Sequence, residues 1–172
     1  IVRDKVQSKL NEFTEYTMLN SGRLSGHVGF TREEVEALCE QYGMDKEECA
    51  RWYDGYRLTD TIDIYNPLAV VSAMRNQEFE SYWSVTGSFE ALKDYILMDF
   101  EGIRQDVVAM ISGGSVEVDV HSYLNTMDCF YSKDDVFTYL IHLGYLSYNK
   151  KDKTCCIPNE EVRQEWVRSV KL

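Results

Sequence analysis

The feature that most constrains the fold is a helix start signal that occurs twice in close succession. Thr31 and Glu34 have the spacing of a capping box, in which each side chain bonds the backbone amide of the other residue. Asp45 and Glu48 repeat that spacing. The glycines that end the two stretches are Gly43 and Gly55. The segment is therefore predicted to form two short helices joined by one turn, an αα-hairpin.

Similar signals continue along the chain and predict a mainly α fold with a small α+β part. Asn66 and Pro67 form an N-cap followed by proline at the first helical position. Residues 115–120 alternate as a half-buried strand does. Beyond them a helix, a β-hairpin and a final helix are predicted, an order typical of the second half of a winged-helix domain. We expect a helical bundle over residues 31–114 and a winged-helix-like domain over residues 119–172.

The charge of the chain disfavours two classes of partner. The sequence has 29 acidic and 18 basic residues, a net charge of −11, and the residues from 128 onward sum to zero. Such a surface repels phosphates, so neither nucleic acid nor an anionic membrane is an expected partner. No apolar run approaches the roughly 20 residues that cross a bilayer. We therefore expect a soluble, cytoplasmic protein.

The chain carries none of the common catalytic motifs. It has no Gly-x-x-x-x-Gly-Lys-[Ser/Thr] phosphate-binding loop, no [Asp/Glu]-x-Lys nuclease pair and no Gly-x-Ser-x-Gly nucleophile motif. The histidines His27, His121 and His142 lack ligand-spaced partners. The sequence therefore predicts no catalytic residue, no metal site and no cofactor within this chain, which taken alone does not look like an enzyme.

The five cysteines are expected to be reduced thiols. Their number is odd, they include no Cys-x-x-Cys pair, and most occupy apolar positions of periodic segments. Cys155 and Cys156 are adjacent, so in a strand they point to opposite faces. One buried and one exposed thiol is the expectation there.

The densest motif is Trp52-Tyr53-Asp54-Gly55-Tyr56-Arg57, in which three aromatic side chains flank a charge pair at a helix end. One interpretation is structural: the aromatic residues anchor the αα-hairpin to the core, and the pair Asp54 and Arg57 ties down a turn. In the alternative interpretation, Arg57 or Arg51 projects toward a phosphate supplied by another domain. Both interpretations remain open at this point.

The tip of the predicted β-hairpin is basic, with Lys150, Lys151 and Lys153 close together. On the wing of a DNA-binding winged helix, such lysines would neutralise backbone phosphates. The helix before the hairpin begins with Asp134 and Asp135, which a phosphate would oppose. A solvated turn is the alternative.

A series of motifs in a fixed order resembles one protein family. These motifs are Gly29-Phe30-Thr31-Arg32-Glu33-Glu34-Val35, Trp52-Tyr53-Asp54-Gly55-Tyr56-Arg57, Ile64-Tyr65-Asn66-Pro67, Tyr82-Trp83, Leu143-Gly144-Tyr145-Leu146 and Ile157-Pro158-Asn159-Glu160-Glu161-Val162-Arg163. Together they resemble the predicted AAA-ATPase-like proteins of bacteria and archaea. In that family a nucleotide-binding AAA-type domain precedes these motifs, and a PD-(D/E)XK nuclease-like domain often follows them.

The resemblance implies that this chain is one portion of such a protein. Residues 1–30 would lead in from an ATPase core, and the following residues would form its helical lid and winged-helix-like domain. ATP and Mg²⁺ would bind the missing AAA-type domain, which is the implied partner, with a downstream nuclease-like domain as a second one. Arg57 is the lid residue expected to contact the nucleotide, and Trp52, Tyr56, Tyr82 and Trp83 would build the core.

Two other functions remain open from the sequence. The lysine-bearing hairpin tip would serve a nucleic-acid-binding winged-helix module. The acidic αα-hairpin, with Glu33, Glu36 and Glu40 on its outer surface, would serve an interaction module that binds a basic partner.

Overall fold

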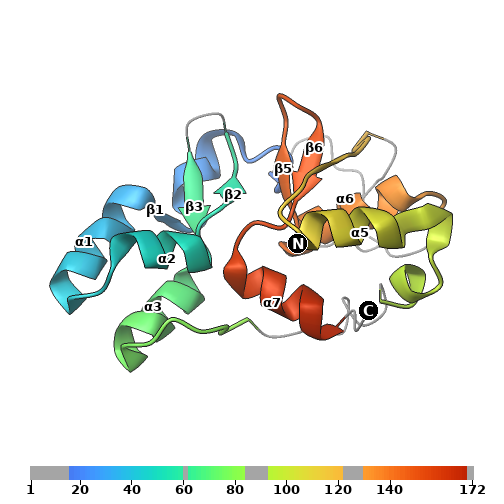
Figure 1. The fold of residues 1–172 in the computed structure, drawn as a ribbon. Helices are drawn as coiled ribbons and strands as arrows, with labels where there is room; N and C mark the ends of the chain where they lie inside the picture. Colours follow the sequence, from blue (N-terminus) through green and yellow to red (C-terminus); the bar gives the residue numbers. More distant parts are fainter. Residues whose placement is uncertain (1–15, 60–61, 84–92, 122–129, 170–172) are drawn as a thin grey trace, which may run out of the picture.

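The computed structural model describes residues 16–59, 62–83, 93–121 and 130–169 (Figure 1). Residues 1–15, which belong to the lead-in segment expected over residues 1–30, lie outside these residues. The helical elements are η1 (Gly22–His27), α1 (Arg32–Tyr42), α2 (Lys46–Tyr53), α3 (Pro67–Asn76), η2 (Phe100–Gly102), α5 (Ile103–Ile111), α6 (Lys133–Leu143) and α7 (Glu160–Ser169). The strands are β1 (Phe30–Thr31), β2 (Tyr56–Arg57), β3 (Asp63–Tyr65), β4 (Val116–Glu117), β5 (Ser147–Asn149) and β6 (Thr154–Cys156).

The αα-hairpin and its caps form as predicted. The Thr31 side chain accepts the amide of Glu34, and the Glu34 carboxylate accepts the amide of Thr31, so the capping box is complete. Asp45 caps α2 by accepting the amide of Glu48. Gly43 ends α1 in the left-handed conformation, with φ of 68°. The strands β1, β3 and β2 lie beside these helices as a three-stranded antiparallel sheet.

The C-terminal part contains a second small sheet of three antiparallel strands, in the order β4-β6-β5. β5 and β6 form the predicted β-hairpin. The predicted strand at residues 115–120 is shorter than expected, since only Val116 and Glu117 pair, with Cys155 and Thr154 of β6. Together with the helices, the two sheets confirm the mainly α fold with a small α+β part. The winged-helix assignment stays a prediction.

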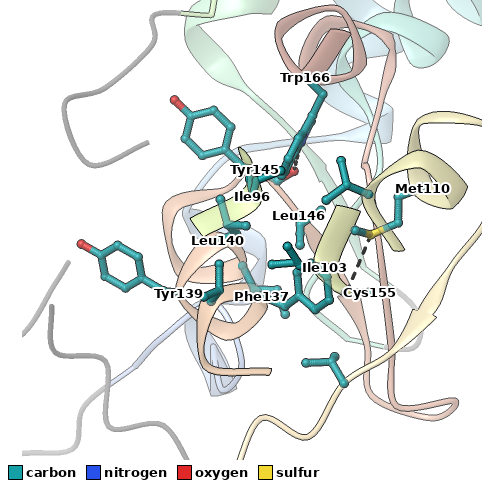
Figure 2. Packing of buried hydrophobic residues seen from close by; sticks show 14 of the residues in the cluster. Ile96, Ile103, Met110, Phe137, Tyr139, Leu140, Tyr145, Leu146, Cys155 and Trp166 are labelled. Carbon is teal, nitrogen blue, oxygen red and sulfur yellow. Dashed lines mark hydrogen bonds between the residues drawn. The ribbon is translucent and has the colours of Figure 1, made fainter. Parts of the chain in front are cut away.

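The buried apolar residues form two clusters. The N-terminal cluster is made by α1, α2, β3 and α3, and Tyr53 is fully buried in it. The C-terminal cluster is larger and includes Phe137, Tyr139 and Leu140 of α6 (Figure 2). Every residue of α6 from Asp135 to Ile141 is buried. Trp166 of α7 lies in it and donates its indole N–H to the carbonyl of Tyr145 at 3.1 Å. Burying this much aromatic and aliphatic surface is the main source of stability.

The C-terminal cluster includes residues that come before residue 114 in the chain, and the expected division near residue 114 stays a prediction. Ile103, Val107 and Met110 of α5 pack in the C-terminal cluster, although the sequence pattern placed them in the helical bundle. The apolar face of α5 was visible in the sequence, but helical periodicity does not say which core that face joins. Helix α7 lies between the two parts of the molecule and contacts both α2 and α5 (Figure 1).

Within the described part of the chain, no helix combines the length and the apolar character needed to cross a membrane.

Candidate functional site

Residues 52–57, which we call the aromatic turn, lie at the joint between the two clusters. The Tyr53 hydroxyl donates to the carbonyl of Glu80 at 2.9 Å. The hydroxyl of Tyr56 donates at 3.0 Å to the carbonyl of Gly144, at the end of α6, and this bond is buried. Trp52 packs in the N-terminal cluster, and its indole N–H donates to the Glu48 carboxylate. The aromatic residues therefore anchor the αα-hairpin, which supports the structural interpretation of the motif.

Gly55 is required where the turn meets the C-terminal part. Its φ is +103°, and a Cβ atom built on it would lie 2.0 Å from the carbonyl oxygen of Pro158. The carbonyl of Asp54 accepts a hydrogen bond of 2.8 Å from the side-chain amide of Asn159. The backbone of the turn thus packs directly against the loop that leads into α7. No larger residue fits at position 55 unless the turn or the segment around Pro158 moves.

The charge pair within the turn differs from the expected one. The Asp54 carboxylate pairs with Arg32 of α1 at 3.1 Å rather than with Arg57. Arg57 instead lies 3.5 Å from Asp63 of the neighbouring strand β3, and its backbone N–H donates to the hydroxyl of Ser147. The expectation that Asp54 orients Arg57 followed from their closeness in sequence. Asp54 is the C-cap residue of α2 and has an extended backbone, whereas Arg57 belongs to strand β2. The two side chains therefore start from different elements.

Arg57 lies at two clefts, each of about 300 Å³. The first lies between residues 19–22, residues 57–59 and the hairpin residues Tyr148 and Lys150. The second is lined by Gly55, Ser115, Asn149, Cys156 and neighbouring residues. About half of the Arg57 side chain is exposed, 52%, so its guanidinium remains available to a further acceptor. We refer to the first of these two clefts as the Arg57 cleft.

Arg51 occupies a different environment. Its guanidinium forms two hydrogen bonds with the Glu48 carboxylate and lies 5.5 Å from the centre of the Trp52 ring. It lines neither of the clefts beside Arg57. The structure therefore separates the two arginines that the sequence offered as phosphate contacts, and Arg57, unlike Arg51, lines these two clefts.

The three lysines of the hairpin tip are all exposed. Lys150 lines the Arg57 cleft, so the hairpin brings it close to Arg57. Lys153 lines a separate, open cleft of about 760 Å³ with Asp119, Asp134 and Asp152. Burial raises the pKa of the Asp134 carboxyl there, and the Lys133 ammonium partly offsets the shift. This open cleft is mixed in charge and unsuited to a polyanion.

The histidines and acids form no metal centre within the described residues. No group of three or more His, Cys, Asp or Glu side chains is placed to hold an ion there. The Nδ1 atom of His121 lies 3.1 Å from Asp119, and both side chains are strongly exposed. On the acidic face of α1, Glu33, Glu36 and Glu40 are exposed, and Glu40 bonds Lys46.

Glu161 is a residue that the sequence analysis did not single out as a site. It lies in the first turn of α7 and is fully buried at the joint with residues 80–83. The available signal was its place next to Val162 and four residues before Glu165, on the side of α7 that turns to the core. This spacing does not show how deeply Glu161 is buried, because its burial arises from distant contacts.

The chain is similar in part to one known protein. No family model and no solved structure matches the chain. A protein of Azotobacter chroococcum mcd 1, described as an uncharacterized protein in the vnfD 5' region, is 31% identical over 98 residues. The match covers 52% of this chain and 19% of the relative, so the chain corresponds to about a fifth of that protein's length.

Proposed function

We propose that this chain is a non-catalytic, regulatory portion of an AAA-ATPase-like protein, which docks on a preceding nucleotide-binding domain and senses the nucleotide through Arg57. ATP and Mg²⁺ would be held by that domain. The motif order described above supports this assignment, and so does the absence of a phosphate-binding loop from the sequence. The proposal rests mainly on the position of Arg57.

Arg57 has the surroundings that a sensing arginine needs. Its guanidinium is half exposed at the rim of the Arg57 cleft, whose opposite wall is residues 19–22. The ion pair with Asp63 is long, at 3.5 Å, so a phosphate oxygen can replace the carboxylate as the partner. Lys150 adds a second positive charge at the same rim.

The test compares two arginines of the same turn in the longer protein. The upstream coding sequence is expected to encode a P-loop, and the protein that includes it is expected to hydrolyse MgATP. Arg57→Ala is expected to weaken nucleotide binding or hydrolysis roughly tenfold or more, because a charge-assisted hydrogen bond is lost. Arg51→Ala serves as the matched control and is expected to have little effect. Equal effects of both substitutions would contradict the role of Arg57.

A second measurement tests the non-catalytic assignment directly. This chain alone is expected to show no measurable affinity for MgATP in isothermal titration calorimetry. Tight binding would mean that the chain holds a phosphate cradle of its own and would overturn the proposal.

One observation favours a second candidate, a nucleic-acid-binding module. The exposed Lys150, Lys151 and Lys153 lie at the tip of a β-hairpin that belongs to the sheet β4-β6-β5. Helix α6, the segment before this hairpin, has no exposed residue and so cannot read base edges. Binding would therefore use the phosphate backbone and weaken steeply with salt. Unchanged affinity for duplex DNA after substitution of all three lysines by alanine would exclude this candidate.

A further inference from the structure

The joint between the two clusters contains a fully buried carboxyl group. Glu161 has no exposed surface, and its Oε1 atom accepts the backbone N–H of Tyr82 at 2.8 Å. The backbone N–H of Trp83 lies near enough to this carboxyl group to lower its pKa. The other oxygen, Oε2, is buried and has no hydrogen-bond partner among the described residues. Such an arrangement is costly for a charged carboxylate, because one oxygen has lost its water without gaining a donor.

No cation compensates this carboxyl group within the described parts of the chain. On α7, its neighbour is the acid Glu165, which is bonded by the Ser81 hydroxyl and by Arg168. From α2 and β2 the groups facing it are the neutral phenols of Tyr53 and Tyr56. The remaining nearby charges are committed elsewhere, with Arg163 on Glu160 and Arg51 on Glu48.

These surroundings favour the neutral form of the group. Burial raises the pKa of Glu161 to about 7, and the negative charge of Glu165 acts in the same direction, while the two backbone N–H donors partly oppose it. Glu161 therefore changes its charge near neutral pH, whereas an exposed glutamate does so near pH 4.3.

The same carboxyl group bonds the segment that connects the two clusters. Residues 80–83 run from the N-terminal cluster, where Glu80 bonds Tyr53, to the C-terminal cluster, where the Trp83 ring packs edge-on against Tyr145 at 5.4 Å. Between these contacts, α7 binds the segment through Glu161 and Glu165. The Trp83 indole N–H is itself buried without a partner among the described residues.

We propose that Glu161 is a pH switch at this joint: in its neutral form it fixes residues 80–83 on helix α7, and when it ionises the segment is released and the two clusters separate more readily. The driving force is the need of the carboxylate for water, which it reaches only when the joint opens. The switch is a property of this chain and does not depend on any nucleotide.

The expected size follows from linkage. A group whose pKa is raised in the closed joint stabilises that joint fully below its ordinary pKa, and the contribution is lost as the pH rises through the raised value. With an ordinary pKa in the open form, the opening equilibrium increases about tenfold between pH 6 and pH 8. Hydrogen exchange at the amides of Tyr82 and Trp83, corrected for the intrinsic pH dependence of exchange, measures this equilibrium.

The test uses this chain and two neighbouring substitutions. The wild type and the control Glu160→Gln, which changes a partly exposed acid paired with Arg163, are expected to show the tenfold loss of protection. Glu161→Gln, which cannot ionise, is expected to show none. The same pH dependence in Glu161→Gln as in the wild type would overturn the proposal.

A second measurement uses the wild type alone and therefore tests the switch even if Glu161→Gln fails to fold. The Glu161 carboxyl carbon is followed by NMR during a pH titration, and its midpoint is expected to coincide with the midpoint of the protection loss, near pH 7. A midpoint in the ordinary range of glutamate, or a protection loss at another pH, would overturn the proposal.

Discussion

The hydroxyl of Tyr56 donates a buried hydrogen bond of 3.0 Å to the carbonyl of Gly144, 88 residues later in the chain. Tyr56 belongs to β2, beside the N-terminal cluster, and Gly144 ends α6 at the centre of the C-terminal cluster. The Trp83 ring packs on the same glycine from the connecting segment. Tyr56, Trp83 and Gly144, which are far apart in the sequence, are therefore in contact at this glycine. Burial also raises the pKa of the Tyr56 phenol, so this donor stays protonated at all ordinary pH values.

Tyr56→Phe is expected to destabilise the protein by about 1–3 kcal/mol. The substitution keeps the ring but leaves the buried Gly144 carbonyl without this donor. Urea denaturation followed by circular dichroism measures the change. Tyr42→Phe is the control, because Tyr42 is 42% exposed, and its effect should stay within about 0.5 kcal/mol. Equal effects of both substitutions would show that the bond contributes nothing to stability.

Gly55→Ala is expected to cost about 3 kcal/mol or more, since the new Cβ atom would overlap the Pro158 carbonyl. The matched control is Gly43→Ala. Gly43 also has a positive φ, +68°, but a Cβ atom there meets nothing within 4 Å, so only about 1 kcal/mol is expected. Thermal unfolding of the two variants separates the steric cost from the conformational cost. Similar losses of stability in both variants would contradict the close contact between Gly55 and Pro158.

Local signals predicted the helix starts, while the contacts of the joint were beyond them. A capping box is made within four residues, so Thr31 and Glu34 were sufficient to place the start of α1. The partner of Asp54 could not be inferred in this way, because Arg32 lies 22 residues earlier and competes with the nearer Arg57. The burial of Glu161 depends on residues 79 positions away in the chain. The fold class was therefore predictable, and the arrangement of the joint was not.

Thr31→Ala is expected to destabilise the protein by about 1 kcal/mol, because the amide of Glu34 loses the acceptor that caps α1. Thr31→Ser keeps a hydroxyl at the same position and should restore most of the loss. Guanidinium denaturation of the three proteins provides the measurement. A serine variant as unstable as the alanine variant would mean that the methyl group of Thr31, rather than its hydroxyl, matters.

Cys155 and Cys156 are expected to differ sharply in reactivity, because they face opposite sides of β6. Cys155 is fully buried, and burial raises its pKa to about 12, so almost no thiolate forms near neutral pH. Cys156 is only partly buried, and the positive charge of Arg57 counteracts the raised pKa of its thiol. Iodoacetamide at about pH 8 should therefore label Cys156 in the native protein and reach Cys155 only after unfolding.

Mass spectrometry of the peptide that carries both cysteines distinguishes one modification from two. Arg57→Ala should slow the labelling of Cys156, since the thiolate loses a nearby positive charge, whereas Arg51→Ala should not. Labelling of both cysteines at the same rate in the native protein would contradict the burial of Cys155 in the C-terminal cluster. An unchanged rate in Arg57→Ala would place the guanidinium too far from Cys156 to act on it.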